Sequence, residues 1–404
     1  MSASSYPIRP GTVADLPEIA RQDGVQFGYE FRGRALEDVL RILDPERFLI
    51  ATAGAPGSER VVGVSGEYDL NFSLPGGGNI DMPAVTWVSV APTHTRRGIL
   101  RSLLETQLRR YIDEGAAAST LTASQGGIYE RFGFGAATQI REMAISTHGA
   151  RLRREVDATG VWLGTADEAR SLLPDVHERW RTQVPGLVRR NAARWDAVID
   201  DPSDSGQRKM FLLHEDGYVV FRPELHKDEG HPDSTLRIIE YATTTPQAHA
   251  ALWQSMLSME LYAWIETEMA PIDDPIEHLL LDARQVRTRS VADLAWVRPL
   301  NIAALLSARS YAVEFEVVWE LRDSLLGDAR YRIKGGAEGA EVARTDDSAD
   351  LSSDVSVLGA LYLGGHRLQS FLRGGRAEGG DEGLLRRVDR ALLADRAPLA
   401  GTSF

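Results

Sequence analysis

Residues Trp87 to Leu104, WVSVAPTHTRRGILRSLL, decide the fold of the domain that contains them. The apolar, β-branched run 85–90 predicts a strand, and the spacing of apolar residues from Gly98 to Ile112 predicts a helix. The loop between them places Arg96 and Arg97 at the helix start, where backbone N–H groups lack intrahelical partners and attract anions. Because the arginine fork also suits phosphate oxygens, the stretch predicts a pyrophosphate cradle.

Two other interpretations of this turn follow from its residues. A basic helix start paired with surface carboxylates would show the same pattern and would bind no ligand. Among phosphate sites, the turn has neither the Lys-Ser/Thr of a P-loop nor the G-x-G-x-x-G of a dinucleotide site, so ATP and NAD are disfavoured. Gly98 favours a ligand, because a residue without Cβ lets the backbone approach it closely.

The composition of the whole chain limits its class. Its 404 residues suggest two or three domains, and 58 acidic against 45 basic side chains give a net charge of −13. This acidity argues against a nucleic-acid partner and suits a cationic small molecule. The chain has no cysteine, which excludes disulfides and thiol catalysis and fits a reducing cytoplasm. No apolar stretch approaches the roughly 20 residues of a membrane span.

The order of the elements predicts three domains. Strands alternate with helices up to residue 150, which indicates a mixed α/β domain over residues 1–150. A second unit over residues 151–291 includes an expected helix from Ala248 to Ile265, and the pattern changes again for a third unit over residues 292–404. The glycine-rich stretch RGGRAEGGDEG, Arg373 to Gly383, is predicted to be a loop.

Two motifs in order carry a family resemblance. The strand-loop-helix with R-R-G-I resembles motif A of the GNAT acetyltransferases, and YERFGF from Tyr129 to Phe134 matches the Y-x-x-x-G-F helix of that superfamily. VSVAPTHTRRGILR followed by SQGGIYERFGFGAAT looks like the Eis (enhanced intracellular survival) family of acetyltransferases. HERWRTQVPG, LAWVRPLNIAALLSARSY and VLGALYLGGHR extend the likeness along the whole chain.

The resemblance implies a fold and an activity. The expected fold is two tandem GNAT folds, the N-terminal one catalytic and the central one degenerate, followed by an α+β domain like sterol carrier protein. The implied activity is transfer of acetyl from acetyl-CoA to amines of aminoglycosides or other polyamine and lysine-containing acceptors, with a link to antibiotic resistance. The resemblance also implies a homohexamer. A cytoplasmic location is expected from the absence of cysteine, and no metal is expected.

The resemblance implies a donor site beside the arginine turn. The backbone of the strand would hold the pantetheine and Ser124 would seat the cofactor, while Tyr129 would be the general acid that protonates the coenzyme A thiolate. The residues expected to bind the cofactor are Val88, Val90, Arg96, Arg97, Gly98 and Ser124. Each has a plainer interpretation: core strand for the valines, a strand-end hydroxyl for Ser124 and packing for Tyr129. Thr95 and Leu100 depart from the superfamily loop.

The acceptor site is implied in the same way. The α-carboxylate of Phe404 would be the general base, carried into the site by the C-terminal tail, although most chain ends are merely frayed. Trp87 would line the acceptor pocket, with a core position as the alternative, and Glu30 would meet the cationic acceptor, with a plain surface position as the alternative. Ser403 stands where the family often has glutamate, which removes one negative charge.

Two rival functions remain open at this stage. The protein N-myristoyltransferases also join two GNAT folds and use a terminal carboxylate, so the donor could be a longer acyl-CoA. Alternatively, the chain is a non-catalytic small-molecule binder or carrier that uses its third domain. Transfer by direct attack in a ternary complex is expected, because no cysteine or activated serine is present to form an acyl-enzyme.

Overall fold

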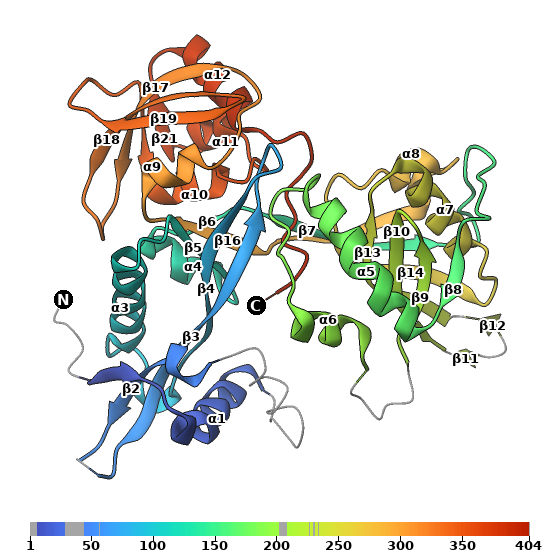
Figure 1. Ribbon diagram of the computed structural model, residues 1–404, viewed down its shortest axis with the longest axis horizontal. Coiled ribbons are helices and arrows are strands. Elements are labelled where there is room, and N and C mark those ends of the chain that lie inside the picture. The colour runs from blue at the N-terminus through green and yellow to red at the C-terminus, as the bar shows by residue number, and fades with distance from the viewer. Residues whose placement is uncertain are drawn as a thin grey trace.

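The chain folds into three units, each built on its own sheet (Figure 1). The computed structural model describes residues 6–28, 44–55, 57–201, 208–225, 227–228, 231–232 and 234–403. Two of the sheets have seven strands and the third has five. Helices pack against each of them, so the chain is a mixed α/β protein, as the alternation of strands and helices predicted.

The first sheet has helices on both faces. Alternate residues of one strand point to opposite faces, so Ile50 packs with Ile19 of α1 while Leu49 and Ala51 pack with Ile99 of α3. In sheet order the strands are β1 (Ile8–Pro10), β2 (Leu49–Ala53), β3 (Arg60–Ser73), β4 (Asn79–Val90), β5 (Ala118–Thr122), β16 (Ala295–Pro299) and β6 (Gly135–Ala136). The helices are η1 (Val13–Asp15), α1 (Leu16–Phe27), η2 (Pro45–Arg47), η3 (Pro92–His94), α3 (Ile99–Asp113), α4 (Gly126–Tyr129) and η4 (Glu130–Phe132).

The second sheet repeats this layered arrangement. Tyr218 and Val220 pack with α5 in one apolar cluster, while Val219 and Phe221 pack with α7 in another. In sheet order the strands are β15 (Val286–Asp293), β7 (Gln139–Ser146), β14 (Tyr262–Ala270), β13 (Ser234–Thr243), β10 (Gly217–Glu224), β9 (Met210–His214) and β8 (Trp162–Gly164). The helices are α5 (Ala166–Arg181), α6 (Ala192–Ile199), α7 (Pro246–Leu257), α8 (Ile276–Leu279) and η5 (Ala283–Gln285), and a small ribbon joins β11 (Lys227–Asp228) to β12 (His231–Pro232).

The third sheet closes over one long apolar core. Trp319 lies in that core with Leu358 of α10 and Val388 of α12. In sheet order the strands are β19 (Gly339–Arg344), β18 (Ala329–Gly336), β17 (Phe315–Arg322), β20 (Leu351–Asp354) and β21 (Ala377–Gly379). The helices are α9 (Ile302–Ser307), α10 (Val355–Leu361), α11 (Leu368–Arg373) and α12 (Glu382–Leu392).

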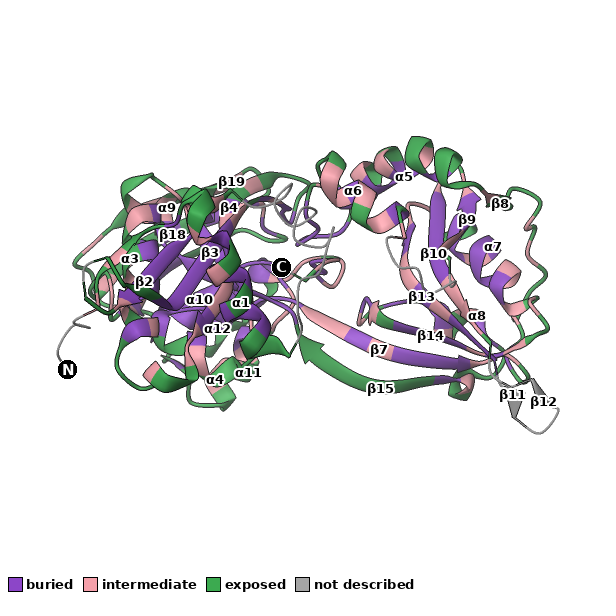
Figure 2. Cartoon of the chain, turned by 90° about the horizontal axis from the view of Figure 1, so that it is seen from below, coloured by how far each residue is buried: buried purple, intermediate pink, exposed green. Residues whose placement is uncertain are grey.

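The chain passes between the first two sheets twice. Directly after β6 it enters the second sheet as β7, and after β15 it returns to the first sheet as β16, which pairs with β5 and β6. Figure 2 shows β7 and β15 running side by side along one edge of the second sheet. The first two units therefore share two continuous connections and are not joined by a single linker. The domain boundaries at residues 150 and 291 stay a prediction.

Two local predictions are wrong. The helix expected from Ala248 to Ile265 ends at Leu257, and residues from Tyr262 onward form β14. Apolar residues fill both faces there because β14 lies between β13 and β7, so periodicity does not separate helix from strand. The loop expected from Arg373 to Gly383 contains β21, since its backbone adds to the edge of β20.

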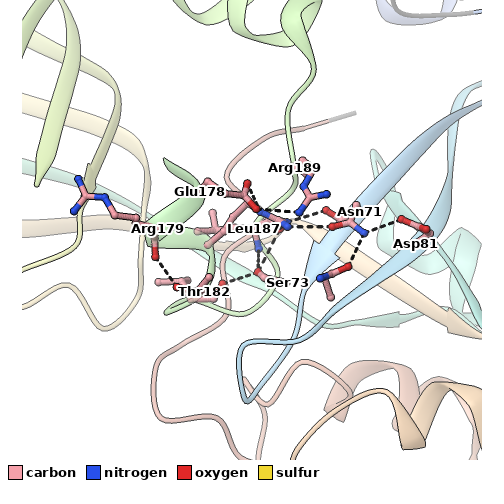
Figure 3. A network of polar contacts seen from close by, with 11 residues as sticks. Asn71, Ser73, Asp81, Glu178, Arg179, Thr182, Leu187 and Arg189 are labelled. Carbon is pink, nitrogen blue, oxygen red and sulfur yellow. Dashed lines mark hydrogen bonds and ion pairs between the residues drawn. The ribbon is translucent and has the colours of Figure 1, made fainter. Parts of the chain in front are cut away.

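The β3–β4 hairpin docks on the central unit through polar contacts (Figure 3). The Ser73 hydroxyl donates to the Val184 carbonyl at 2.7 Å and accepts from the Leu187 N–H at 2.9 Å. Arg181 at the end of α5 donates to the carbonyl and the side-chain oxygen of Asn71, both at 3.0 Å. Ser73 and Arg181 are buried, so these bonds satisfy polar groups that no water reaches and fix the first two units against each other.

Gly359 allows helix α10 of the third unit to pack closely on strand β16 of the first sheet. A Cβ on Gly359 of α10 would lie 2.2 Å from the Val297 carbonyl oxygen, which is backbone and cannot rotate away. We expect Gly359→Ala to force α10 off β16 and to lower the free energy of unfolding by about 1–3 kcal/mol. Thermal denaturation measures this loss, with Gly380→Ala as control because no atom lies within 4 Å of its Cβ position. Equal midpoints for the two variants would contradict this packing.

Candidate active site

Strand β4 separates from β5 just before the arginine turn. The two strands pair in parallel at Ala84↔Thr120 and Val85↔Leu121 only, and beyond them β4 pairs with β3 alone. Where the strands part, the β3–β4 register shifts and Trp87 adopts a left-handed φ of 53°, which is rare for a bulky residue. We call this divergence the fork. Val88 and Val90, both partly buried, lie on its open strand.

The turn after β4 presents its basic residues to solvent. Arg96 has a left-handed φ of 61°, and Gly98, also left-handed at 82°, caps α3 without a side-chain bond. Arg96, Arg97 and Gly98 are all exposed. The predicted strand and helix are confirmed, since β4 ends at Val90 and α3 begins at Ile99. The first-turn N–H groups and the two guanidinium groups therefore lie together at one end of a 15-residue helix.

Tyr6, just before β1, contacts two residues of this turn. The Arg97 Nη1 donates to the Tyr6 hydroxyl at 3.0 Å, and the Tyr6 ring meets the His94 ring edge-on at 5.6 Å. His94 Nδ1 lies 2.8 Å from the Thr93 hydroxyl. His94 is thus a loop contact, and Tyr6 holds Arg97 at the helix start. No sequence motif pointed to Tyr6.

Tyr129 lies in an apolar pocket beside the fork. Its ring packs in one buried cluster with Val85, Val88 and Trp296, and it is 6% exposed. The ring also contacts Phe134 edge-on, with centroids 6.2 Å apart. Burial raises the pKa of the Tyr129 phenol to about 12, so the hydroxyl keeps its proton at neutral pH. Because Val88 packs against the same cluster, the Tyr129 proton donor lies on the side of the sheet that Val88 faces.

Residues on the opposite face of the first sheet form an aromatic wall. Trp87 and Tyr68 pack against the cluster that contains Phe48 and Ile19, and the Trp87 and Phe48 rings meet at 86° with centroids 5.7 Å apart. A side-chain hydrogen bond joins Tyr68 to Trp87. Trp87 is therefore half-buried at the fork, with one side on the core.

Of the other predicted site residues, one is at the surface and two lie outside the described residues. Ser124 is exposed, two residues after the end of β5. Glu30 and Phe404 both lie outside the residues that the structure describes. The tail before Phe404 is described, and it runs between the first two units with Leu399 and Ala400 buried.

The central unit clamps this tail. Three hydrogen bonds hold it: Ala397 N to Asp273 Oδ2 at 2.8 Å, Leu399 N to the Pro185 oxygen at 2.9 Å, and Arg190 Nη2 to the Gly401 oxygen at 3.2 Å. Arg190 is buried and ion-paired with Glu240, which also accepts from the Tyr218 hydroxyl at 2.6 Å. These bonds fix residues 397–401 against the central unit. Sequence patterns gave no signal for the clamp.

A second fork occurs in the central unit without a basic turn. Strands β13 and β14 pair in parallel only as far as Ile238, and the β10–β13 register shifts there, as it does in the first sheet. The turn that follows is Thr243-Thr244-Thr245-Pro246, and Asp274 lines the adjoining cavity of about 380 Å³. The turn before α7 carries no arginine of its own, and Arg396 lines the cavity together with Asp273 and Asp274. The second fork therefore has no paired cation at its helix start to hold a pyrophosphate. Only the first sheet combines a fork with a cationic helix start among the described residues.

Comparison with known proteins agrees with this division. Residues 7–137 and 186–299 each match the acetyltransferase (GNAT) domain family, and residues 302–401 match the sterol carrier protein domain family. The N-acetyltransferase Eis of Mycobacterium tuberculosis (strain CDC 1551 / Oshkosh) is 37% identical over 371 residues, which cover 86% of this chain and 89% of that protein.

The chain belongs to the Eis family of N-acetyltransferases. A crystal structure of Eis1 from Mycobacterium abscessus superposes with a TM-score of 0.86 at 30% identity, covering 98% of this chain and all of that one. An uncharacterized N-acetyltransferase of Streptomyces coelicolor is 32% identical over 84% of this chain and 85% of its own length. The fold is thus two GNAT domains and a domain like sterol carrier protein, and the Eis family makes this chain an acetyltransferase.

The described ranges also bear on membranes and metals. None of the helices described is both long enough and apolar enough to cross a membrane. No three or more His, Asp or Glu side chains in the same ranges are grouped so as to hold a metal ion. The expected absence of a metal stays a prediction.

Proposed function

We propose that this Eis-family enzyme transfers acetyl from acetyl-CoA to an amine of a cationic acceptor, by direct attack in a ternary complex. The observation that carries the proposal is that the fork, the cationic helix start and the buried Tyr129 phenol all lie beyond the paired part of β4 and β5, at the carboxyl ends of these strands. A thioester donor with a pyrophosphate needs these three features, and the second fork lacks the cationic helix start.

The residues at the turn fit coenzyme A. The exposed first-turn N–H groups of α3 with Arg96 and Arg97 suit the pyrophosphate, and Gly98 has no side chain to block it. We infer that the pantetheine adds to the open strand at Val88 and Val90, where the backbone can polarise the thioester carbonyl. Ser124, at the end of β5, would contact the donor from the other strand.

The acceptor is proposed to reach the fork from the aromatic wall. An alkylamine is mostly ammonium at neutral pH and must lose a proton before it attacks. We infer that the α-carboxylate of Phe404 takes this proton and that the Tyr129 phenol stabilises the departing thiolate. Trp87 would line the acceptor pocket and Glu30 would meet its charge. The net charge of −13 favours cationic acceptors, such as aminoglycosides, polyamines or lysine-containing peptides.

Assembly and location are inferred from the family. We infer a cytoplasmic homohexamer with no nucleic-acid partner. Analytical ultracentrifugation of the purified chain tests the hexamer, and a monomer at micromolar concentration would overturn it.

An acceptor panel tests the proposed function. Aminoglycosides, polyamines and lysine-containing peptides are incubated with acetyl-CoA, and release of free thiol is followed with mass spectrometry of the products. We expect amine-dependent thiol release and a mass gain on the acceptor. Release only with longer acyl-CoAs would replace acetyl with another acyl donor. No release with any acceptor and donor would favour a non-catalytic binder.

The donor site gives one prediction with a matched control. We expect Arg97→Ala to raise the KM for acetyl-CoA about ten- to a hundredfold with little change in kcat, because it removes a charge-assisted bond to the pyrophosphate. Arg109→Ala is the control, since Arg109 is an exposed arginine on α3 well beyond its first turn. An equal KM for both variants would show that charge at this particular turn does not bind the donor.

A further inference from the structure

One arginine of the central domain lies against the catalytic domain. Arg194 is in the first turn of α6, and its guanidinium carbon is 4.7 Å from the centroid of the Tyr68 ring on β3. This is cation–π distance. Tyr68 is hydrogen-bonded to Trp87, so the contact extends the aromatic wall from the fork to the central domain.

Arg194 has no neutralising partner among the described residues. Its side chain makes no ion pair with them, and the charged neighbour that acts on it is another cation, Arg190. Burial lowers the pKa of Arg194, yet an arginine remains charged at neutral pH. The two arginines of the loop before α6 differ from Arg194, because Arg189 is paired with Glu178 and Arg190 with Glu240. The Arg194 charge is therefore felt along the wall.

The start of α6, which carries Arg194, lies near the tail. Arg190 stacks on Trp195 at 4.9 Å and donates to the Gly401 oxygen, so the start of α6 and the end of the tail are neighbours. Trp87 lies at the point where β4 leaves β5, while Val88 packs with the Tyr129 cluster and not with that of Trp87. An acceptor that enters between the tail and the fork therefore passes Trp87, Tyr68 and Arg194.

We propose that Arg194 sets the acceptor charge, a proposal that rests on the proposed function. A second ammonium beside the aromatic wall is repelled by the guanidinium, and a carboxylate or a neutral group there is favoured. The preferred acceptor is thus an amine with a single positive charge whose other end is neutral or anionic. The buried carboxylate of Asp23 acts on Tyr68 but is not among the charges that act on Arg194. Polycations such as aminoglycosides are the disfavoured members of the acceptor class.

Three amines of equal chain length test this proposal. Cadaverine ends in a second ammonium, δ-aminovalerate in a carboxylate and pentylamine in a methyl group. For each, kcat/KM is measured by thiol release at saturating acetyl-CoA. We expect the native chain to prefer δ-aminovalerate to cadaverine by roughly tenfold, and Arg194→Leu to bring the ratio close to one. Arg194→Lys should keep most of the preference, and Arg194→Glu should reverse it.

The controls separate this inference from the proposed function. Arg189→Leu removes an exposed, paired arginine nearby and should leave the ratio unchanged. Pentylamine reports general damage, since its kcat/KM should change little in any of these variants. If amines are acetylated but the ratio is the same in the native chain, Arg194→Leu and Arg194→Glu, the inference is overturned and the proposed function stands. If no amine releases thiol in the native chain, both fall.

Discussion

Replacing Tyr129 with phenylalanine should lower kcat by about a hundred- to a thousandfold while acetyl-CoA binding stays nearly unchanged. The hydroxyl is the only group lost, and the ring that packs against Val88 and Trp296 remains. A loss confined to kcat would show that the hydroxyl stabilises the transition state specifically. A hydroxyl that stabilised the bound substrate equally well would change KM instead. Thiol release gives kcat, and calorimetry with coenzyme A gives the affinity.

The raised pKa limits what this phenol can do. At about 12 it is a weaker acid than a thiol, whose pKa in water is about 8.5. Full transfer of the proton to the thiolate is therefore unfavourable unless the same apolar pocket also raises the pKa of the thiol. We infer that Tyr129 donates a strong hydrogen bond to the sulfur as charge develops and completes the transfer only as the thiol forms.

A matched control and a pH profile test this role. Tyr111→Phe removes another hydroxyl in the same buried cluster and should leave kcat unchanged. Because the Tyr129 phenol keeps its proton, kcat should show no descending limb from it between about pH 6 and pH 10. Protein stability should fall as pH rises from about 10, the pKa of an unfolded tyrosine, toward 12, because only the unfolded state loses the proton there. Equal turnover for the two variants would remove Tyr129 from the mechanism.

The sequence predicted the local elements of the site well because they follow from short stretches. The strand that ends at Val90 and the helix that begins at Ile99 lie within one periodic segment, and R-R-G fixes the chemistry of the turn between them. The φ of Trp87 was not predictable, since a tryptophan is disfavoured in the left-handed region and adopts it here where β4 parts from β5.

Contacts between distant segments escaped the sequence. Trp296, in the same cluster as Tyr129, comes from β16. This strand follows all the strands of the second sheet in the sequence and pairs with the first sheet. Arg194 over Tyr68 and Arg190 on Gly401 depend on how the first two units dock, through buried bonds such as that of Ser73 to Val184. No local periodicity encodes such a pair, because each side chain suits its own helix or strand equally well without its partner.

The C-terminal carboxylate should be as important to turnover as the phenol. Converting the α-carboxylate of Phe404 to a carboxamide by semisynthesis should lower kcat by about a hundredfold or more, because the ammonium then has no base in reach. Phe404→Ala keeps the carboxylate and loses the side chain, so it should retain more activity than the carboxamide. One added glycine would move the carboxylate beyond its place and should act like the carboxamide.

The three bonds that clamp the tail let the Phe404 variants report on catalysis without a change in stability. The bonds of Ala397, Leu399 and Gly401 to the central domain lie before the altered residue, so the thermal midpoint should be the same in all three tail variants. Arg190→Met, in contrast, would leave Glu240 buried without its partner and should lower both stability and kcat. If the carboxamide turns over like the native chain, the base is another group, and the clamp then serves only to join the domains.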